Sequence, residues 1–179
     1  MRLSIVIGAL VALVASPGWA KQPALEVVEH VDLERYLGTW YEIASYPAWF
    51  QRNCTAVTAD YSLRDDGLIR VVNSCRKGGL DGPLKQSSGR ARVVDPTTNA
   101  KLQVSFFGPF WGDYWIIDLD PSYRWAVVGV PSRKYLWILS RTPTMDDALY
   151  REIVGRLPAR GYTPNTLNRT LQPEQPEDR

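Results

Sequence analysis

Short apolar runs separated by turn residues repeat along the chain from Thr39 onward. Each run is rich in Val, Ile, Tyr, Trp and Thr, and a cluster of Gly, Pro, Asp or Asn follows it. This spacing is typical of antiparallel strands joined by hairpins. The pattern predicts eight strands, at Thr39–Tyr46, Thr55–Leu63, Leu68–Ser74, Lys85–Val94, Lys101–Phe107, Tyr114–Leu119, Trp125–Val130 and Leu136–Arg141.

The predicted strands fall into two classes. In Thr55–Leu63 and Lys101–Phe107, apolar residues alternate with polar ones, which indicates one wet face. From Tyr114 to Arg141 the strands are apolar on both faces, so we expect a helix to cover them. Eight such strands could close into a barrel or stack as a sandwich. We predict an all-β fold, an eight-stranded up-and-down antiparallel β-barrel with one C-terminal α-helix packed on the outside.

One clear helix pattern follows the strands. Thr144 is the predicted N-cap, with Asp147 three residues later. Apolar residues then recur at helical spacing before Pro158 and Gly161: Met145, Ala148, Leu149, Ile153 and Leu157. The Pro- and Glu-rich tail, residues 172–179, is predicted to be disordered.

The N-terminal segment, residues 1–20, resembles a secretory signal. Arg2 precedes an apolar run from Leu3 to Ala15, and small residues follow near Ala20. We expect cleavage there and a single domain over residues 21–171; a retained apolar N-terminus is the alternative. No cysteine follows the run, so we expect free export to the periplasm or the medium rather than a lipid anchor.

The charge balance argues against a polyanionic partner. The chain has 21 Lys and Arg and 19 Asp and Glu. Loss of Arg2 with the signal leaves 21 − 1 = 20 basic residues, a net charge of +1. The two signs are interspersed, whereas nucleic-acid-binding proteins concentrate basic residues on one face.

Two cysteines, Cys54 and Cys75, flank the turn residues Asp65-Asp66-Gly67. In an exported chain they favour a disulfide. A tight turn centred on Arg64-Asp65 would place them directly opposite, whereas a turn centred on Asp66 would leave them about 10 Å out of register unless a β-bulge intervenes. A nucleophilic cysteine is the alternative, but the only histidine, His30, precedes the first strand.

Five blocks of the sequence resemble the lipocalin family. Residues 38–44 (GTWYEIA), 118–123 (DLDPSY) and 137–143 (WILSRTP) are similar to its three signature regions. Residues 61–67 (YSLRDDG) and 104–110 (VSFFGPF) resemble its bacterial outer-membrane branch, which is related to apolipoprotein D. The resemblance covers nearly all of the mature chain. It implies a short helical turn at Asp32–Leu37 and association with the outer membrane.

The resemblance gives Gly38, Trp40 and Arg141 a structural role. It implies that Trp40 plugs the closed end of the barrel and that Arg141 lies across the ring, in a cation–π contact worth about 1–2 kcal/mol. Glu42 shares the inward frame with Trp40. We expect a buried carboxylate near the bottom of the cavity, paired with an interior tyrosine or with Arg141; a catalytic acid is the less favoured interpretation.

The inward frame of the family also implies a ligand site. The interior-facing positions would be almost all apolar: Val57, Ala59, Tyr61, Ile69, Val71, Leu102, Val104, Phe106, Tyr114, Ile116, Ala126, Val128, Trp137 and Leu139. We expect eight of these positions to contact a ligand: Val57, Ala59, Tyr61, Val71, Val104, Phe106, Tyr114 and Trp137. Tyr61 and Tyr114, together with Asn73, would supply the few polar groups that orient its head group. In the first loop, Trp49 and Phe50 are candidate lid or membrane-touching residues.

The implied function is transport of a small hydrophobic ligand, a fatty acid or a lysophospholipid, by a monomer or weak homodimer without a cofactor or metal. A long acyl chain suits such a lining because each buried methylene gains about 0.8 kcal/mol. Two alternatives are a carrier of a pigment or haem, and an enzyme acting on a lipid-derived substrate.

Overall fold

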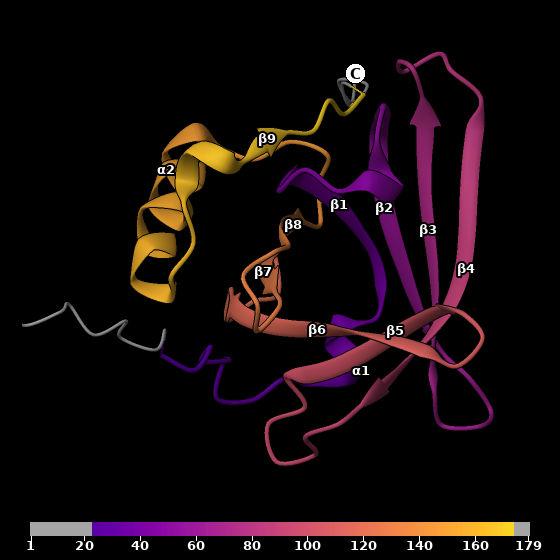
Figure 1. The fold of residues 1–179 in the computed structure, drawn as a ribbon, viewed down its shortest axis with the longest axis vertical. Coiled ribbons are helices and arrows are strands. Elements are labelled where there is room, and N and C mark those ends of the chain that lie inside the picture. Colours follow the sequence, from indigo (N-terminus) through magenta and orange to yellow (C-terminus); the bar gives the residue numbers. More distant parts are fainter. Residues whose placement is uncertain (1–22, 174–179) are drawn as a thin grey trace, which may run out of the picture.

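The computed structural model describes residues 23–173, and a closed antiparallel barrel dominates it (Figure 1). Its strands are β1 (Gly38–Ser45), β2 (Cys54–Leu63), β3 (Ile69–Lys77), β4 (Leu84–Val93), β5 (Lys101–Phe107), β6 (Phe110–Leu119), β7 (Trp125–Gly129) and β8 (Leu136–Ser140). Each strand pairs with the next one along the chain, and β1 pairs with both β2 and β8. The predicted eight-stranded up-and-down barrel is therefore confirmed.

Short helices lie at the two ends of β1. The α-helix α1 (Leu33–Tyr36) precedes it, and Asp32 caps that helix by accepting a hydrogen bond from the Arg35 backbone N–H at 3.2 Å. The 3₁₀ helix η1 (Trp49–Gln51) follows β1. The predicted helical turn at Asp32–Leu37 is present. We call the α1 end of the barrel the closed end and the η1 end the open end.

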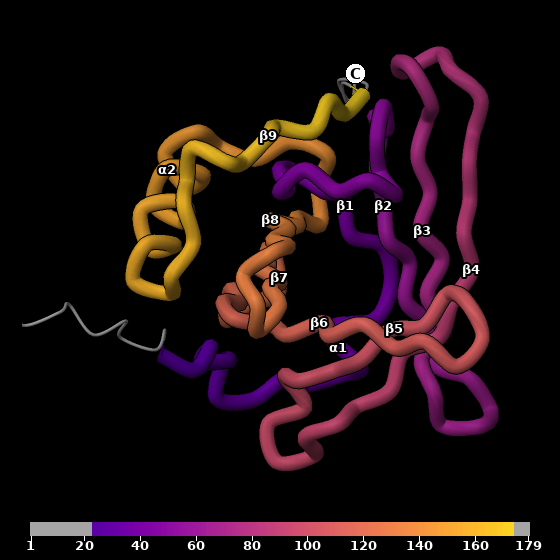
Figure 2. The backbone as a smooth tube through the Cα atoms, in the orientation of Figure 1, coloured from indigo at the N-terminus to yellow at the C-terminus, as the bar shows by residue number. Residues whose placement is uncertain are grey.

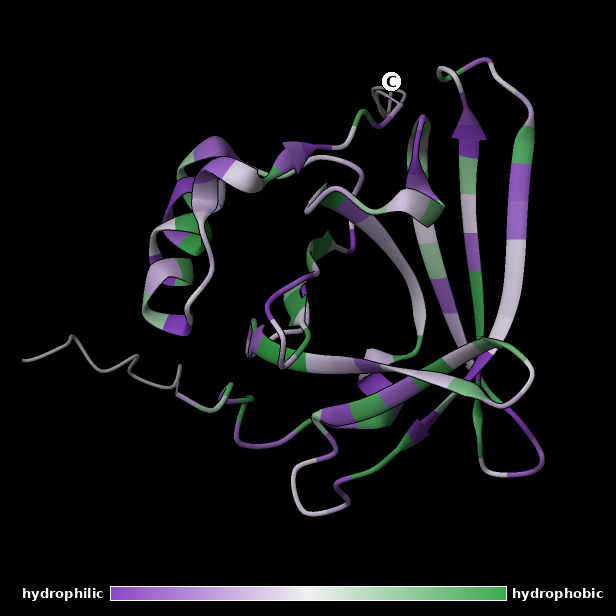
Figure 3. Cartoon of the chain, viewed as in Figure 1, coloured by the Kyte–Doolittle hydropathy of each residue, from purple (hydrophilic) through white to green (hydrophobic). Residues whose placement is uncertain are grey.

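The barrel wall separates two apolar layers. Alternate residues of β7 point to opposite sides: Ala126 and Val128 belong to the interior core, whereas Trp125 and Val127 belong to an outer core. The outer core also contains Ile153 of α2 (Asp147–Arg156). Figure 3 shows hydrophobic and hydrophilic residues mixed along α2, as expected for a helix with one buried face. The strands predicted to be apolar on both faces thus lie under the helix.

The start of α2 differs from the prediction. Asp146, not Thr144, is the N-cap, and its carboxylate accepts hydrogen bonds from the backbone N–H groups of Ala148 and Leu149 at 2.8 and 3.0 Å. The helix gains two satisfied donors and a negative charge at its N-terminus. After α2 come the 3₁₀ helices η2 (Leu157–Arg160) and η3 (Pro164–Thr166).

A ninth strand, β9 (Asn168–Arg169), extends the sheet beside β1 and was not predicted (Figure 2). Gln172, assigned by sequence to the disordered tail, donates hydrogen bonds to the carbonyls of Glu42 and Val57 at 2.9 and 2.8 Å. Gln172 is thus held against β1 and β2. The last positions of that predicted tail, 174–179, lie outside the described residues, as does the predicted signal.

The hairpin between β2 and β3 turns one and a half residues later than a direct pairing of the two cysteines would need. Tyr61 pairs with Val71, which centres the turn on Asp66. Of the two turns that the sequence left open, the one centred on Asp66 therefore forms. Without a further change, the two cysteines would be three positions out of register.

A β-bulge in β2 brings the cysteines within bonding distance. The register shifts between Thr55 and Thr58, where Ala56 takes a φ of 46°. Cys54 then pairs with Lys77, only two positions from Cys75. The Cys54–Cys75 disulfide forms, with its Cα atoms 5.5 Å apart. The prediction of a disulfide is confirmed, and the β-bulge is what brings the two cysteines close enough to form it.

Candidate functional site

A cavity of about 370 Å³ occupies the open half of the barrel. Apolar and aromatic residues predominate in its wall, with a few neutral polar groups and two acidic residues. Its lining comprises Glu42, Phe50, Gln51, Val57, Thr58, Ala59, Tyr61, Val71, Asn73, Val104, Phe106, Gly112, Asp113, Tyr114, Val130, Ser132, Tyr135, Trp137 and Leu139. A lining of this kind suits a small ligand that is mostly apolar.

Every residue predicted to contact a ligand lines this cavity except Trp49, whose side chain is 70% exposed. Trp49 instead packs edge to face on Phe50, with ring centroids 5.7 Å apart. Asn73 lines the cavity as expected. Other predicted inward positions belong to the interior core and are not among the residues that line the cavity: Ile69, Leu102, Ile116, Ala126 and Val128.

Several lining residues were not predicted from the sequence: Gln51, Thr58, Gly112, Asp113, Val130, Ser132 and Tyr135. Tyr135 could have been found by continuing the two-residue alternation of Trp137 and Leu139 back by one step. No comparable signal marked Gln51, because it lies in η1, where no strand alternation applies.

Three tyrosine hydroxyls meet on the closed side of the cavity. The Tyr114 hydroxyl lies 2.8 Å from that of Tyr36 and accepts a hydrogen bond from that of Tyr61 at 2.9 Å. Burial raises the pKa of Tyr61 to about 12 and that of Tyr114 well above its usual value. All three therefore stay neutral at physiological pH, and they give the cavity a polar but uncharged floor.

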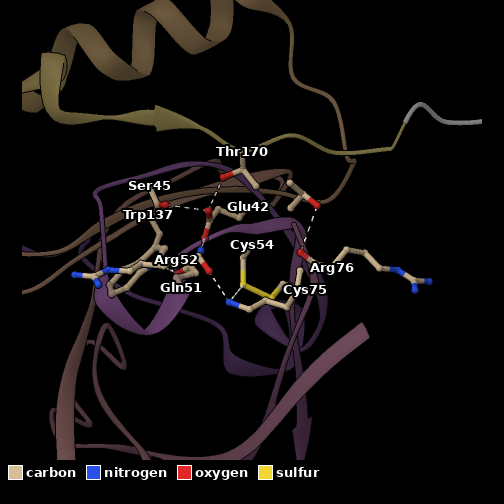
Figure 4. Close-up of a disulfide and its surroundings, with 11 residues drawn as sticks. Glu42, Ser45, Gln51, Arg52, Cys54, Cys75, Arg76, Trp137 and Thr170 are labelled. Carbon is tan, nitrogen blue, oxygen red and sulfur yellow. Dashed lines mark hydrogen bonds between the residues drawn. A yellow bond between two sulfur atoms is a disulfide. The ribbon is translucent and has the colours of Figure 1, made fainter. Parts of the chain in front are cut away.

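Glu42 lies at the opposite end, buried at 3% exposure. Its Oε1 accepts hydrogen bonds from Ser45 Oγ at 2.9 Å and Thr170 Oγ1 at 2.5 Å, and its Oε2 accepts one from Gln51 Nε2 (Figure 4). Burial raises its pKa, and these hydrogen bonds oppose the rise. The expectation of an interior tyrosine or Arg141 as its partner is wrong, because Ser45 at the end of β1, Gln51 of η1 and Thr170 just after β9 supply the donors.

Aromatic rings gather beside Glu42 at the open end. Trp137 stacks on Tyr135 with ring centroids 5.8 Å apart, and Phe50 packs edge to face on Tyr135 at 5.5 Å. Trp137 Nε1 donates a hydrogen bond to Gln51 Oε1 at 3.4 Å. Gln51 therefore ties η1 to both Glu42 and Trp137, which holds that helix against the mouth of the cavity.

The closed end is stabilised by Arg141 and Trp40. The Arg141 guanidinium carbon lies 3.8 Å from the Trp40 ring centroid, as the resemblance implied. Its nitrogens donate hydrogen bonds to the carbonyls of Arg35, Thr39 and Tyr123 at 2.6, 3.0 and 3.3 Å. These contacts tie α1, β1 and the β6–β7 turn together. Neither Trp40 nor Arg141 is among the residues that line the cavity.

Gly38 allows the backbone to enter β1 beside Arg141. Its φ of +88° lies in the left-handed region, which glycine adopts without strain. A Cβ at this position would make an ordinary 3.5 Å contact with the Arg141 guanidinium, so the backbone angle and not crowding is the constraint. This accounts for the glycine of the first signature block.

Comparison with known proteins shows which family this chain belongs to. A family model described as a lipocalin-like domain matches residues 31–172. The chain belongs to the lipocalin family, as its sequence blocks indicated.

The most similar relatives include proteins from bacteria and plants. The chain is 44% identical over 165 residues to outer membrane lipoprotein Blc of Escherichia coli K12, covering 90% of this chain and 93% of Blc. It is 40% identical over 163 residues to temperature-induced lipocalin-1 of Arabidopsis thaliana, covering 86% of each. Mouse apolipoprotein D is 32% identical over 166 residues, covering 88% of this chain and 85% of that protein.

Solved structures show the same fold at lower identity. Insecticyanin from the tobacco hornworm Manduca sexta superposes with a TM-score of 0.69 at 20% identity, covering 86% of this chain and 87% of that one.

In the part of the chain that the structure describes, no helix is long and apolar enough to cross a membrane.

Proposed function

We propose that this lipocalin is a carrier, and not an enzyme, for a single-chain lipid: a fatty acid or a lysophospholipid. The observation that carries the proposal is the cavity of about 370 Å³, apolar along its walls and polar at both ends. Each methylene moved from water into such a wall gains about 0.8 kcal/mol. An acyl chain uses the whole apolar length, whereas a compact polar metabolite would leave it empty.

A lipid-modifying enzyme on this fold would most plainly use a reactive thiol. Both cysteines of the chain are joined in the disulfide, which favours the carrier. A carrier of a pigment or haem is the other alternative; colour in freshly purified protein would favour it.

The rim of the open end supports contact with the cell-envelope membrane. Trp49 is 70% exposed, and Phe107 and Phe110 at the β5–β6 hairpin are each 77% exposed. Aromatic side chains are favoured at membrane–water interfaces. We propose a periplasmic monomer or weak homodimer that touches the outer membrane and exchanges lipid there, in keeping with the relative named outer membrane lipoprotein Blc.

Tryptophan fluorescence tests the carrier proposal. Trp137 is the tryptophan of the cavity lining, so delipidated protein titrated with long-chain lipids should show a saturable change in emission. Trp137→Phe should lose most of that change while still binding lipid in a competition assay. Absence of saturable binding across fatty acids and lysophospholipids would refute the proposal.

A further inference from the structure

The charges of the cavity lining are all of one sign. Among its residues there is no lysine, arginine or histidine, whereas Glu42 and Asp113 are acidic. Asp113 pairs with Gln103 on β5, and its carboxylate accepts a hydrogen bond from Gln103 Nε2 at 3.4 Å. Its neighbours Gly112 and Tyr114 pair with the inward residues Val104 and Leu102, so Asp113 points to the outer face. Glu42 is thus the one charge of the lining that faces inward.

The charge on Glu42 has no cationic partner within residues 23–173. Its three side-chain partners, Ser45, Gln51 and Thr170, are neutral, and it takes part in no ion pair among the described residues. Buried charges in proteins are normally compensated by an opposite charge. An uncompensated carboxylate at the mouth of a ligand cavity points to a ligand that brings the cation.

Aromatic rings beside Glu42 provide a second element of cation recognition. Phe50 and Trp137 line the cavity with Glu42, and Trp137 is linked to it through Gln51. Ring faces attract ammonium groups within about 6 Å, and trimethylammonium groups are bound in this way. The Tyr135 ring already has a cation near it, because Lys134 Nζ lies 5.5 Å from its centroid. We therefore leave Tyr135 out of the ammonium site.

We propose that Glu42, with Phe50 and Trp137, binds the ammonium group of a single-chain amphiphile. The cavity then prefers lipids with an ammonium head over free fatty acids of the same chain length. A quaternary ammonium suits the site because it has no N–H to satisfy, and the oxygens of Glu42 already accept three hydrogen bonds. A fatty-acid carboxylate would face Glu42 without a compensating cation. This inference rests on the proposed carrier function.

Four probes with one 14-carbon chain test the preference: lysophosphatidylcholine, alkyltrimethylammonium, monoacylglycerol and the free fatty acid. Each competes with a fluorescent lipid at neutral pH below its micelle concentration. We expect both ammonium probes to bind at least about tenfold more tightly than the fatty acid. The trimethylammonium probe distinguishes recognition of the cation alone from recognition that also needs the phosphate.

Two matched variants assign the preference to Glu42. Glu42→Gln should bring the ammonium probes within about threefold of monoacylglycerol, whose own affinity should not change. Asp65→Asn removes an exposed charge from the β2–β3 turn, outside the cavity lining, and should leave the ranking intact. Trp137→Leu should weaken the ammonium probes more than monoacylglycerol, and Trp137→Phe should restore them in part.

The outcomes separate this inference from the carrier proposal. Fatty acid that binds as tightly as the ammonium probes, or an unchanged preference in folded Glu42→Gln, would overturn the inference and leave a carrier of another specificity. Failure of all four probes to bind would overturn the carrier proposal itself. If Glu42→Gln does not fold, the ranking measured on the native protein decides the inference.

Discussion

Affinity should rise with acyl-chain length and then level off at a length that the cavity sets. If a methylene occupies about the 30 Å³ that a water molecule takes in the liquid, then about 370 Å³ holds about twelve methylenes. Each contributes about 0.8 kcal/mol, so two additional carbons should tighten binding by about fifteenfold until the cavity is full. Titration of monoacyl lipids from 6 to about 18 carbons by calorimetry or fluorescence measures this directly.

A pair of neighbouring valines gives this prediction its control. Val71 lines the cavity, whereas Val72, the next residue of β3, alternates to the outer face. Val71→Trp should fill part of the cavity and move the plateau to shorter chains, and Val72→Trp should leave it unchanged. Affinity that does not depend on chain length, or that shows the same plateau in both variants, would refute the assignment of the acyl chain to this cavity.

Three further predictions concern the closed end, the disulfide and Glu42. Arg141→Leu should lower the free energy of unfolding by about 3 kcal/mol, measured in urea, because it removes the contact with Trp40 and three hydrogen bonds; a loss below about 1 kcal/mol would contradict that account. Replacing Cys54 and Cys75 by alanine should cost about 3 kcal/mol, the loop-closure value for their separation of 21 residues, and equal stability of oxidised and reduced protein would contradict it. Burial raises the pKa of Glu42 above its ordinary 4.5, so between these two pKa values the folded protein binds a proton that the unfolded chain has lost. The free energy of unfolding should therefore fall as pH rises from 4.5 through the raised pKa. Denaturation measured across this pH range should show the fall in the native protein and not in Glu42→Gln.

The barrel could be predicted from the sequence because hydrophobic alternation is a local signal. A residue such as Val104 between polar neighbours specifies both a strand and its inward face, whatever the rest of the chain does. Strands that are apolar on both faces are also a local signal, and they predicted that a helix covers the outer face of the barrel. The resemblance then added what alternation alone cannot provide, the contact between Trp40 and Arg141, whose residues lie far apart in the sequence.

Other features depend on contacts that no local pattern encodes. The β-bulge at Ala56 sets the disulfide register, yet an alanine with positive φ leaves no signature in the sequence. The strand Asn168–Arg169 is polar and two residues long, so its pairing with β1 could not be anticipated. The environment of Glu42 was equally out of reach, because two of its three donors, Gln51 and Thr170, come from other segments.

Native mass spectrometry of protein purified without delipidation from the cells that make it tests the central claim most directly. The account predicts one single-chain lipid bound per barrel in the native protein and in Val72→Trp, and its loss or shortening in Val71→Trp. Absence of any bound lipid, or the same lipids in equal amount on Val71→Trp, would contradict the claim that this cavity carries a single-chain lipid.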